Sequence, residues 1–269
     1  MLNHHDSLAV DTWQPLLTTR YMGHGNVQVL QEATSTNTLL KQMALSGAPA
    51  GSLCLCETQT AGKGRLGRSW HSPAGQGLWL SVLLRPRIQP EQAPLVTLCA
   101  ALSMAQAVNE VTGLDARIKW PNDLVLDRKK LCGILLEIGF GNEGIDYIIV
   151  GTGLNVRKGA YPADLAHQAT SIEDHMAPPP RRELLVRYLA ALEEIIARLE
   201  SEGFAALAED YRARSCTLGS MVKVSGSEEF TGTAEAIDET GALLVRDESG
   251  ELRRVLAGDV SVRGVMGYV

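Results

Sequence analysis

The stretch TAGKGRLGRSW, Thr60 to Trp70, alternates glycines with cationic side chains. These residues are Gly62, Lys63, Gly64, Arg65, Gly67 and Arg68. Glycine lets the backbone wrap closely round a ligand, and the cations supply charge, so the segment indicates an anion-binding loop. The strand-like stretches GSLCLCETQT (51–60) and GLWLSVLLRP (77–86) run into and out of it. A glycine-rich loop between two strands is the feature that decides the fold.

This placement excludes the commonest interpretation of three spaced glycines. The dinucleotide fingerprint G-x-G-x-x-G needs a helix that begins inside the motif and an acidic residue about 20 positions later. Here the chain resumes as a strand, and the later window LLRPRIQP (83–90) has no carboxylate. The H-R-D and D-F-G segments of protein kinases and the Walker lysine motif are also absent. A Rossmann oxidoreductase, a protein kinase and a P-loop enzyme are therefore disfavoured.

Strand and helix patterns alternate through the first two thirds of the chain. NVQVLQEA (26–33) predicts a strand, and STNTLLKQMALSGA (35–48) a helix capped by the hydroxyl of Thr34 or Ser35. A nearly all-apolar helix, 93–113, should be buried. Strands are then predicted at 116–120, 130–140 and 146–156, with DLVLDRKK (123–130) and FGNEG (140–144) as the turns between them. Tight turns between successive strands predict an antiparallel or mixed sheet and an α+β fold.

The last third of the chain has a different pattern. A proline-rich break is followed by an amphipathic helix or helix pair over about 182–214. From Cys216 the period becomes two, with turns at 239–241 and 249–250, which is typical of four or five strands in a small β-barrel. We predict a domain of residues 1–214 and a barrel domain of residues 215–269.

Composition limits the setting. The 269 residues carry a formal charge of −6, which disfavours a dedicated nucleic-acid binder. No uninterrupted apolar run reaches about 18 residues, and the first residues lack a signal peptide, so we expect a cytoplasmic protein without membrane contact. Five cysteines with no C-x-x-C pair predict reduced, mostly buried thiols and no metal ligands.

Two further segments give the glycine-rich loop a function. KWPNDL (119–124) combines a cation, an aromatic ring, an amide and a carboxylate, Lys130 follows it, and GTGLNV (151–156) adds Asn155. Alone, KWPNDL is also compatible with a structural hairpin in which Lys119 and Asp123 form a solvated ion pair and Trp120 fills the core. Together the three segments offer cations for phosphates, amides for a heterocycle and an aromatic face for stacking, which predicts a nucleotide-using site.

The sequence resembles the biotin protein ligases, also called biotin–acetyl-CoA-carboxylase ligases. The resemblance rests on STN (35–37), QTAGKGRLGRSW (59–70), KWPNDL, KLCGILLE (130–137) and GTGLN, in the family's order. It implies a mixed-sheet catalytic domain, related to lipoate ligases and class II synthetase cores, and a C-terminal SH3-like barrel. Only about 25 residues precede the first matching strand, so we expect a monofunctional form that does not bind DNA. Lys63 departs from the arginine common at its position.

The resemblance implies a reaction in two steps. The carboxylate of biotin attacks the α-phosphate of ATP to give biotinyl-5′-AMP, and a lysine of a biotin carboxyl carrier protein then displaces AMP. Mg²⁺ and cationic side chains must offset the repulsion between carboxylate and polyphosphate. The glycine-rich loop should close over the labile adenylate.

The resemblance also implies site residues. Lys130 should touch the biotin carboxylate and the phosphoryl group, Arg65 and Arg68 should hold phosphates with Lys63 helping, and Asp123 should orient a base or place Mg²⁺. The expected ligand-binding positions are Ser35, Thr36 and Gln59 toward the ureido ring, Asn37 with no more specific role, Gly62 and Gly64 in the loop, Trp70 on adenine, and Asn122 and Asn155 on the nucleotide.

Two alternatives share parts of this pattern. A lipoate or octanoate ligase would have the same fold, but the arginine-plus-triple-glycine segment of those enzymes is absent, and Gln59 would have no purpose there. A non-catalytic biotin-sensing regulator would need a DNA-binding domain. The acceptor is expected to be a carrier domain that adds a strand to a free sheet edge, and the sequence does not decide between a monomer and a homodimer.

Overall fold

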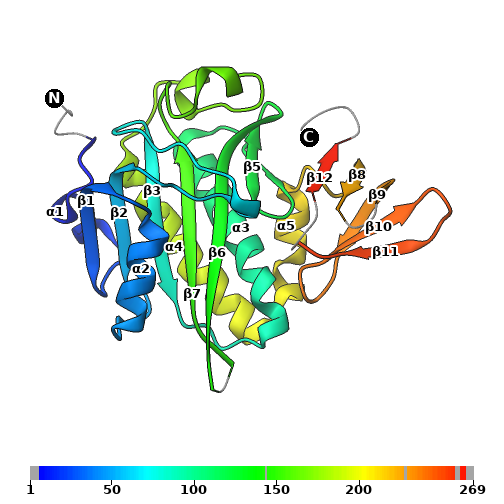
Figure 1. Cartoon of the computed structure of the whole chain (residues 1–269), viewed down its shortest axis with the longest axis horizontal. Helices are drawn as coiled ribbons and strands as arrows, with labels where there is room; N and C mark the ends of the chain where they lie inside the picture. The colour runs from blue at the N-terminus through cyan, green and yellow to red at the C-terminus, as the bar shows by residue number, and fades with distance from the viewer. Residues whose placement is uncertain (1–5, 143, 227–228, 258–260, 265–269) are drawn as a thin grey trace.

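The computed structural model describes residues 6–142, 144–226, 229–257 and 261–264. Seven strands form the larger sheet in the order β1-β2-β3-β7-β6-β5-β4 (Figure 1). Their bounds are β1 (Val27–Ala33), β2 (Leu53–Gln59), β3 (Gly77–Leu84), β4 (Arg117–Lys119), β5 (Asp123–Leu126), β6 (Lys129–Gly141) and β7 (Gly144–Asn155). β1 and β2 run parallel, and the other neighbours pair antiparallel. The predicted mixed sheet and α+β fold are confirmed.

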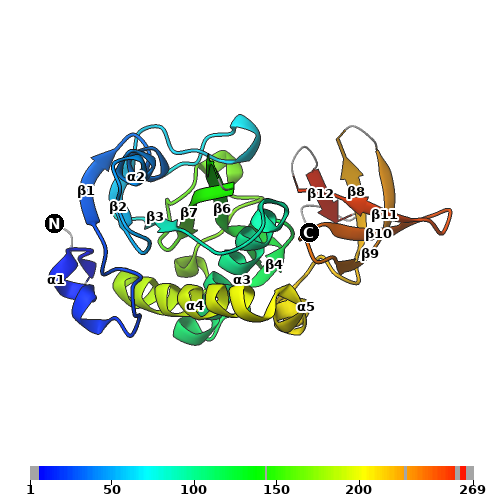
Figure 2. The ribbon, with the colours of Figure 1, turned by 90° about the horizontal axis from the view of Figure 1, so that it is seen from below.

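Helices cover both faces of this sheet. α2 (Thr36–Leu45) packs on one face, and α3 (Ala93–Thr112) and α4 (Arg181–Glu202) pack on the other, as Figure 2 shows. Successive side chains of a strand point to opposite faces. In β2, Leu53 and Leu55 accordingly belong to the core under α3 and α4, and Cys54 belongs to the core under α2.

The predicted apolar helix is confirmed as α3, which ends at Gly113 in the left-handed conformation that terminates helices. With the preceding turn, Pro90–Thr112 is long and apolar enough to cross a bilayer by length and composition, which the sequence analysis did not anticipate. Most of this stretch is buried inside the protein. Its place in the core accounts for its apolar character.

One predicted turn is wrong. Residues 123–126 form strand β5, and the turn to β6 consists only of Asp127 and Arg128, with φ of 46° and 64°. Both angles are positive, as the tightest hairpin connections require, although neither residue is glycine. The strand was not recognised because its apolar residues, Leu124, Val125 and Leu126, form a run of only three before the charged residues from Asp127 onward. The other predicted turn, 140–144, includes residue 143, which lies outside the described residues; β6 and β7 pair up to Gly141 and Gly144.

The predicted hydroxyl cap of α2 is also wrong. Ser35 occupies the N-cap position, but its side chain makes no capping hydrogen bond. The first backbone N–H of the helix, that of Thr36, instead donates to Oε1 of Gln59 at 2.9 Å. The helix start is therefore capped from the end of β2.

The C-terminal sheet has the order β11-β10-β9-β8-β12 and is antiparallel throughout. Its strands are β8 (Met221–Ser225), β9 (Phe230–Ile237), β10 (Leu243–Asp247), β11 (Leu252–Val255) and β12 (Ser261–Gly264). The predicted turns fall between β9 and β10 and between β10 and β11. α4 and α5 (Ala208–Arg214) form the predicted helix pair. The domain boundary at 214/215 stays a prediction.

Candidate functional site

A cavity of about 350 Å³ lies where the glycine-rich loop, β2, β6, β7 and KWPNDL meet. It gathers nearly every residue that the sequence analysis selected. Those lining it are Ser35, Thr36, Asn37, Gln59, Lys63, Gly64, Arg65, Arg68, Trp70, Asn122, Asp123, Lys130 and Asn155. Gly62 lies behind the wall: a Cβ there would come within 2.4 Å of the carbonyl oxygen of Trp70.

The glycine-rich loop folds back on itself as a small hairpin. The N–H of Gly64 donates to the carbonyl of Arg68 at 2.7 Å, and the N–H of Trp70 donates to that of Gly62 at 2.8 Å. At the tip, Leu66 and Gly67 have φ of 56° and 70°. Only Gly67 among the loop glycines has a positive φ, so Gly62 is required for close approach and Gly67 for the turn.

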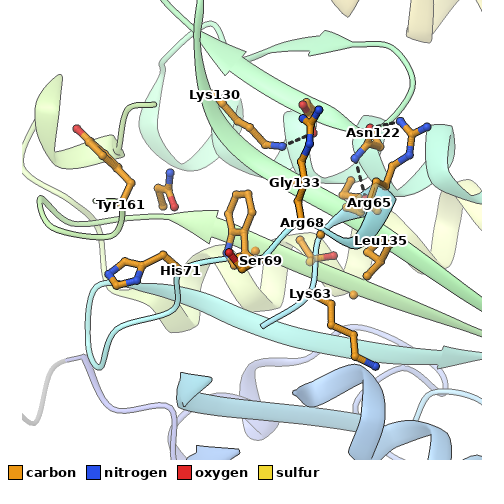
Figure 3. A pocket seen from close by; sticks show the side chains of 18 of the residues that line it. Lys63, Arg65, Arg68, Ser69, His71, Asn122, Lys130, Gly133, Leu135 and Tyr161 are labelled. Atoms are coloured by element: carbon orange, nitrogen blue, oxygen red, sulfur yellow. Dashed lines mark hydrogen bonds and ion pairs between the residues drawn. The ribbon is translucent and has the colours of Figure 1, made fainter. Parts of the chain in front are cut away.

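Arg65 reaches from the loop to two other parts of the chain. One Nη donates to Oδ1 of Asn122 at 2.9 Å, and the other donates to the carbonyl of Ala257 beyond β11 (Figure 3 shows Arg65 beside Asn122). Burial lowers the pKa of the Arg65 guanidinium, while the nearby Asp123 carboxylate opposes that change. The guanidinium stays charged at neutral pH, since an arginine in a protein is not deprotonated there.

Lys130 and Asp123 form the central ion pair of the cavity. Nζ of Lys130 lies 2.7 Å from Oδ1 of Asp123 and 5.2 Å from the centroid of the Trp70 ring. The backbone of Lys130 is fixed too, because its N–H donates to Gln168 and its carbonyl accepts from Thr170. The lysine therefore projects into the cavity from a rigid strand (Figure 3).

Lys63 points the other way. Its side chain leaves the loop on the side opposite Lys130 (Figure 3), and its Nζ lies 3.8 Å from Oε1 of Glu137. Glu137 also accepts a hydrogen bond from Nδ2 of Asn37 at 3.2 Å. Lys63 thus borders the polar end of the cavity. It does not lie beside Lys130, where a side chain that helps to hold the same phosphates would be expected.

Glycines inside strands make room for the Trp70 ring. A Cβ at Gly153 would lie 2.4 Å from Nε1 of Trp70, and one at Gly133 would lie 2.9 Å from its Cζ3. Trp79 meets the ring edge to face at 6.4 Å. Nε1 of Trp70 is buried and has no hydrogen-bond partner among the residues that the structure describes. The sequence analysis missed these glycines, although glycine within a strand is a signal of close approach.

The polar end of the cavity is a network of hydroxyls and amides. Oε1 of Gln59 accepts from the N–H of Thr36, and its Nε2 donates to Oγ of Ser72 at 2.8 Å. The buried Ser81 hydroxyl lies 2.8 Å from Oγ1 of Thr36 and 2.6 Å from Oδ1 of Asn37. Ser72 and Ser81 lie outside the motifs, so the sequence analysis missed them. These groups present neutral donors and acceptors at this end.

Asn155 closes the opposite wall. Its side chain is almost fully buried, and its Nδ2 donates to the carbonyl of Thr170 at 3.0 Å. Its Oδ1 is buried, and no group in the described parts of the chain forms a hydrogen bond with it. A buried acceptor without a partner is costly, so this oxygen suits a ligand N–H.

Trp120 fills the core, as the structural-hairpin alternative for KWPNDL expected, and presents no open face for stacking. It is 1% exposed, and its Nε1 donates to the carbonyl of Gly241 in the C-terminal sheet at 3.1 Å. Its backbone N–H donates to Oγ1 of Thr217 at 2.9 Å. Lys119 is buried as well, so the other part of that alternative, a solvent-exposed pair of Lys119 with Asp123, does not hold. KWPNDL therefore joins the cavity to the C-terminal part of the chain.

A cavity with hydroxyls and amides at one end, a lysine–aspartate pair at its centre and arginines on a glycine-rich loop is typical of ligases that activate an acid with a nucleotide. Residues 29–155 match the model of the biotin/lipoate A/B protein ligase family, and residues 217–263 match that of the biotin protein ligase C-terminal domain.

Named relatives agree with these matches. The biotin–acetyl-CoA-carboxylase ligase of Mycobacterium tuberculosis is 36% identical over 88% of the chain and 89% of that protein. The bifunctional ligase/repressor BirA of Bacillus subtilis is 31% identical over 85% of the chain and 71% of that protein. The biotin protein ligase of Aquifex aeolicus in complex with biotin and ATP superposes with a TM-score of 0.76 at 30% identity, covering 89% of this chain and 99% of that one. The chain belongs to the biotin protein ligase family.

Proposed function

We propose that the protein is an ATP-dependent ligase that converts biotin to biotinyl-5′-AMP and transfers the biotinyl group to a lysine of a biotin carboxyl carrier domain. The observation that carries the proposal is the Lys130–Asp123 pair, held between the polar end of the cavity and the arginines of the loop. A carboxylate and a polyphosphate repel each other, and this pair lies where the two would meet.

Each part of the cavity has a role in this proposal. The amide and hydroxyl network around Gln59 binds the neutral ureido ring, because such a head needs donors and acceptors without charge. Lys130 neutralises the biotin carboxylate and then the charge that develops on the α-phosphate. Arg65 and Arg68 hold the phosphates, and Trp70, Asn122 and Asn155 receive the nucleotide.

Magnesium accompanies the nucleotide. No cluster of three or more metal-binding side chains occurs within the described parts of the chain. Mg²⁺ commonly binds one or two carboxylates together with substrate phosphates and water, and Asp123 is a carboxylate of the cavity wall that fits this mode. The ion would supply additional neutralisation of the phosphates.

The acceptor lysine enters last in this scheme. It attacks the carbonyl of the mixed anhydride, the bond from that carbonyl to the phosphate oxygen breaks, and AMP leaves with the electron pair. Exclusion of water matters before that attack, because an acyl-adenylate hydrolyses in water. The loop hairpin over the cavity suits this purpose.

The first test is biotin-dependent exchange of pyrophosphate into ATP, with biotin, lipoate and octanoate offered separately. We expect exchange with biotin alone, and loss of at least about 100-fold for Lys130→Ala, since the variant removes a charge aimed at the reacting groups. Lys129→Ala is the matched control: Lys129 is the adjacent lysine, and its Nζ donates to the carbonyl of Ala166 at the surface. Exchange with lipoate alone would refute the proposal, and near-normal exchange by Lys130→Ala would refute the role of Lys130.

A further inference from the structure

The N-terminal segment, residues 6–25, packs on α4, and no sequence pattern in it indicated a role. Leu8, Trp13 and Met22 anchor it in the main core. Two carboxylates attach the segment to the rest of the protein, and we call each attachment a tie. Glu193 of α4 accepts hydrogen bonds from the backbone N–H groups of residues 20–22, and Asp6 binds arginines at the other end of the segment. The tie at Glu193 lies in the middle of α4, and the tie at Asp6 lies at its start.

The tie at Asp6 centres on a fully buried arginine. Arg181, the first residue of α4, is 0% exposed. Its Nε donates to Oδ2 of Asp6 at 3.1 Å, and its two Nη atoms donate to the Glu57 carboxylate at 2.8 and 3.1 Å. One Nη also donates to the carbonyl of Gly77 at 3.1 Å. This bidentate geometry holds α4 and the strands β2 and β3 at fixed positions.

Asp6 also binds a second arginine, Arg157, which lies outside the cavity lining but between the lining residues Asn155 and Tyr161 in the chain. Nη2 of Arg157 donates to Oδ2 of Asp6 at 2.9 Å. Arg157 follows Asn155 by two residues, and its backbone N–H donates to the carbonyl of Gln76 at 2.7 Å. The residue after Gln76, Gly77, pairs with Asn155 across β3 and β7. The Asp6 carboxylate is therefore connected to the end of β7 through Arg157, whose backbone is hydrogen-bonded next to the Gly77–Asn155 pair.

We propose that Asp6 is a positioning residue for the nucleotide side of the cavity, and that it acts through Arg157. This inference rests on the proposed function, because it assumes that Asn155 faces ATP. Arg157 begins the segment that runs on through Tyr161 and Gln168, both of which line the cavity. Asp6 fixes the start of that segment and with it the orientation of Asn155.

The two arginines respond differently to loss of the Asp6 charge. Arg181 is buried and keeps its bidentate partner Glu57. The side chain of Arg157 is 33% exposed, and Oδ2 of Asp6 is the carboxylate atom that it contacts. Without that carboxylate Arg157 gains more by turning to water than by staying beside the positive charge of Arg181. The segment after β7 then loosens while the core under α4 stays packed.

The experiment compares Asp6→Asn, Arg157→Gln and their double variant in the full chain. Binding of a non-hydrolysable ATP analogue and of biotin is measured by calorimetry, alongside thermal unfolding. We expect each single variant to weaken nucleotide binding about tenfold and biotin binding less than twofold. The double variant should bind the nucleotide as weakly as Arg157→Gln alone, because the effects of substitutions at two residues that act through the same contact are not additive. Glu193→Gln is the control: it cuts the other tie of the same segment and should leave nucleotide binding unchanged.

Several results would overturn the inference. Equal weakening of biotin and nucleotide binding would show general loosening, and unchanged nucleotide binding in Arg157→Gln, which is partly exposed and expected to fold, would remove the proposed link. Additive effects in the double variant would separate Asp6 from Arg157. Failure of the parent protein to exchange pyrophosphate with biotin would refute the proposed function instead, since the calorimetric comparison does not need turnover.

Discussion

Gly153→Ala tests whether the Trp70 ring is a wall of the reactive site. The new Cβ would lie 2.4 Å from Nε1 and 2.6 Å from Cε2 of the indole. Ordinary contacts begin at about 3.4 Å, so the ring has to move by about 1 Å. Trp79 blocks one direction of movement, and Nζ of Lys130 lies over the ring at 5.2 Å. The displaced indole therefore disturbs Lys130.

The expected magnitude follows from these distances. Overpacking of this kind costs about 1–3 kcal/mol of stability, against which the alanine gains about 0.4–1 kcal/mol from a less flexible unfolded chain. The protein should therefore fold, with a melting temperature a few degrees lower. A misplacement of about 1 Å near reacting groups lowers rates by up to about 100-fold. We expect adenylation to fall by about 10- to 100-fold.

The assay is pyrophosphate exchange at saturating biotin, with thermal unfolding measured on the same samples. Gly141→Ala is the control, because Gly141 lies in β6 without a positive φ and its nearest contact would be ordinary, 3.5 Å from Cβ of Asp146. In a Trp70→Ala background, Gly153→Ala should have little further effect. Exchange within twofold of the parent protein for Gly153→Ala would refute the reasoning.

Two further predictions use the loop and the core. Arg65→Ala should release the adenylate faster while acceptor recognition changes less, which a chase of bound radiolabelled adenylate measures; equal dissociation rates would contradict this. Burial raises the pKa of Cys54, Cys56 and Cys99 from the ordinary thiol value of 9.0 to about 12. At pH 8 these thiols should resist alkylation until the protein unfolds. Because their folded pKa values are raised, their contribution to stability is complete below about pH 9 and is lost as the pH rises toward 12. Rapid labelling of the native protein would refute their burial.

The sequence predicted the parts of the fold that have strong local signals. The long apolar run of α3 and the change of period after Cys216 placed the core helix and the C-terminal sheet correctly. β5 was missed because it is short and charged at its start, and the cap on Thr36 was missed because its acceptor, Gln59, lies 23 residues away. Local patterns carry no information on such long-range contacts.

The residues of the candidate site likewise include some that have a local sequence signal and some that have none. Motif residues such as Lys130 and Asn155 do meet in one cavity, and they were predicted because they belong to short segments rich in charged and amide side chains. Ser81 was not identified because a serine within a buried strand has no pattern of its own, and Glu137 was read only as the end of the strand segment KLCGILLE. The network of Asp6 and Arg181 joins positions 175 residues apart, and only the folded chain brings them together.

The contact of Trp120 with Gly241 bears on any attempt to build a split reporter from this chain. A cut between residues 214 and 215 leaves all the candidate ligand contacts on one fragment. The same cut separates the indole N–H from the Gly241 carbonyl and Arg65 from the Ala257 carbonyl. The larger fragment alone would expose an apolar ring next to its cavity. Complementation between the two fragments would then restore a buried indole and an anchored loop in a single association event.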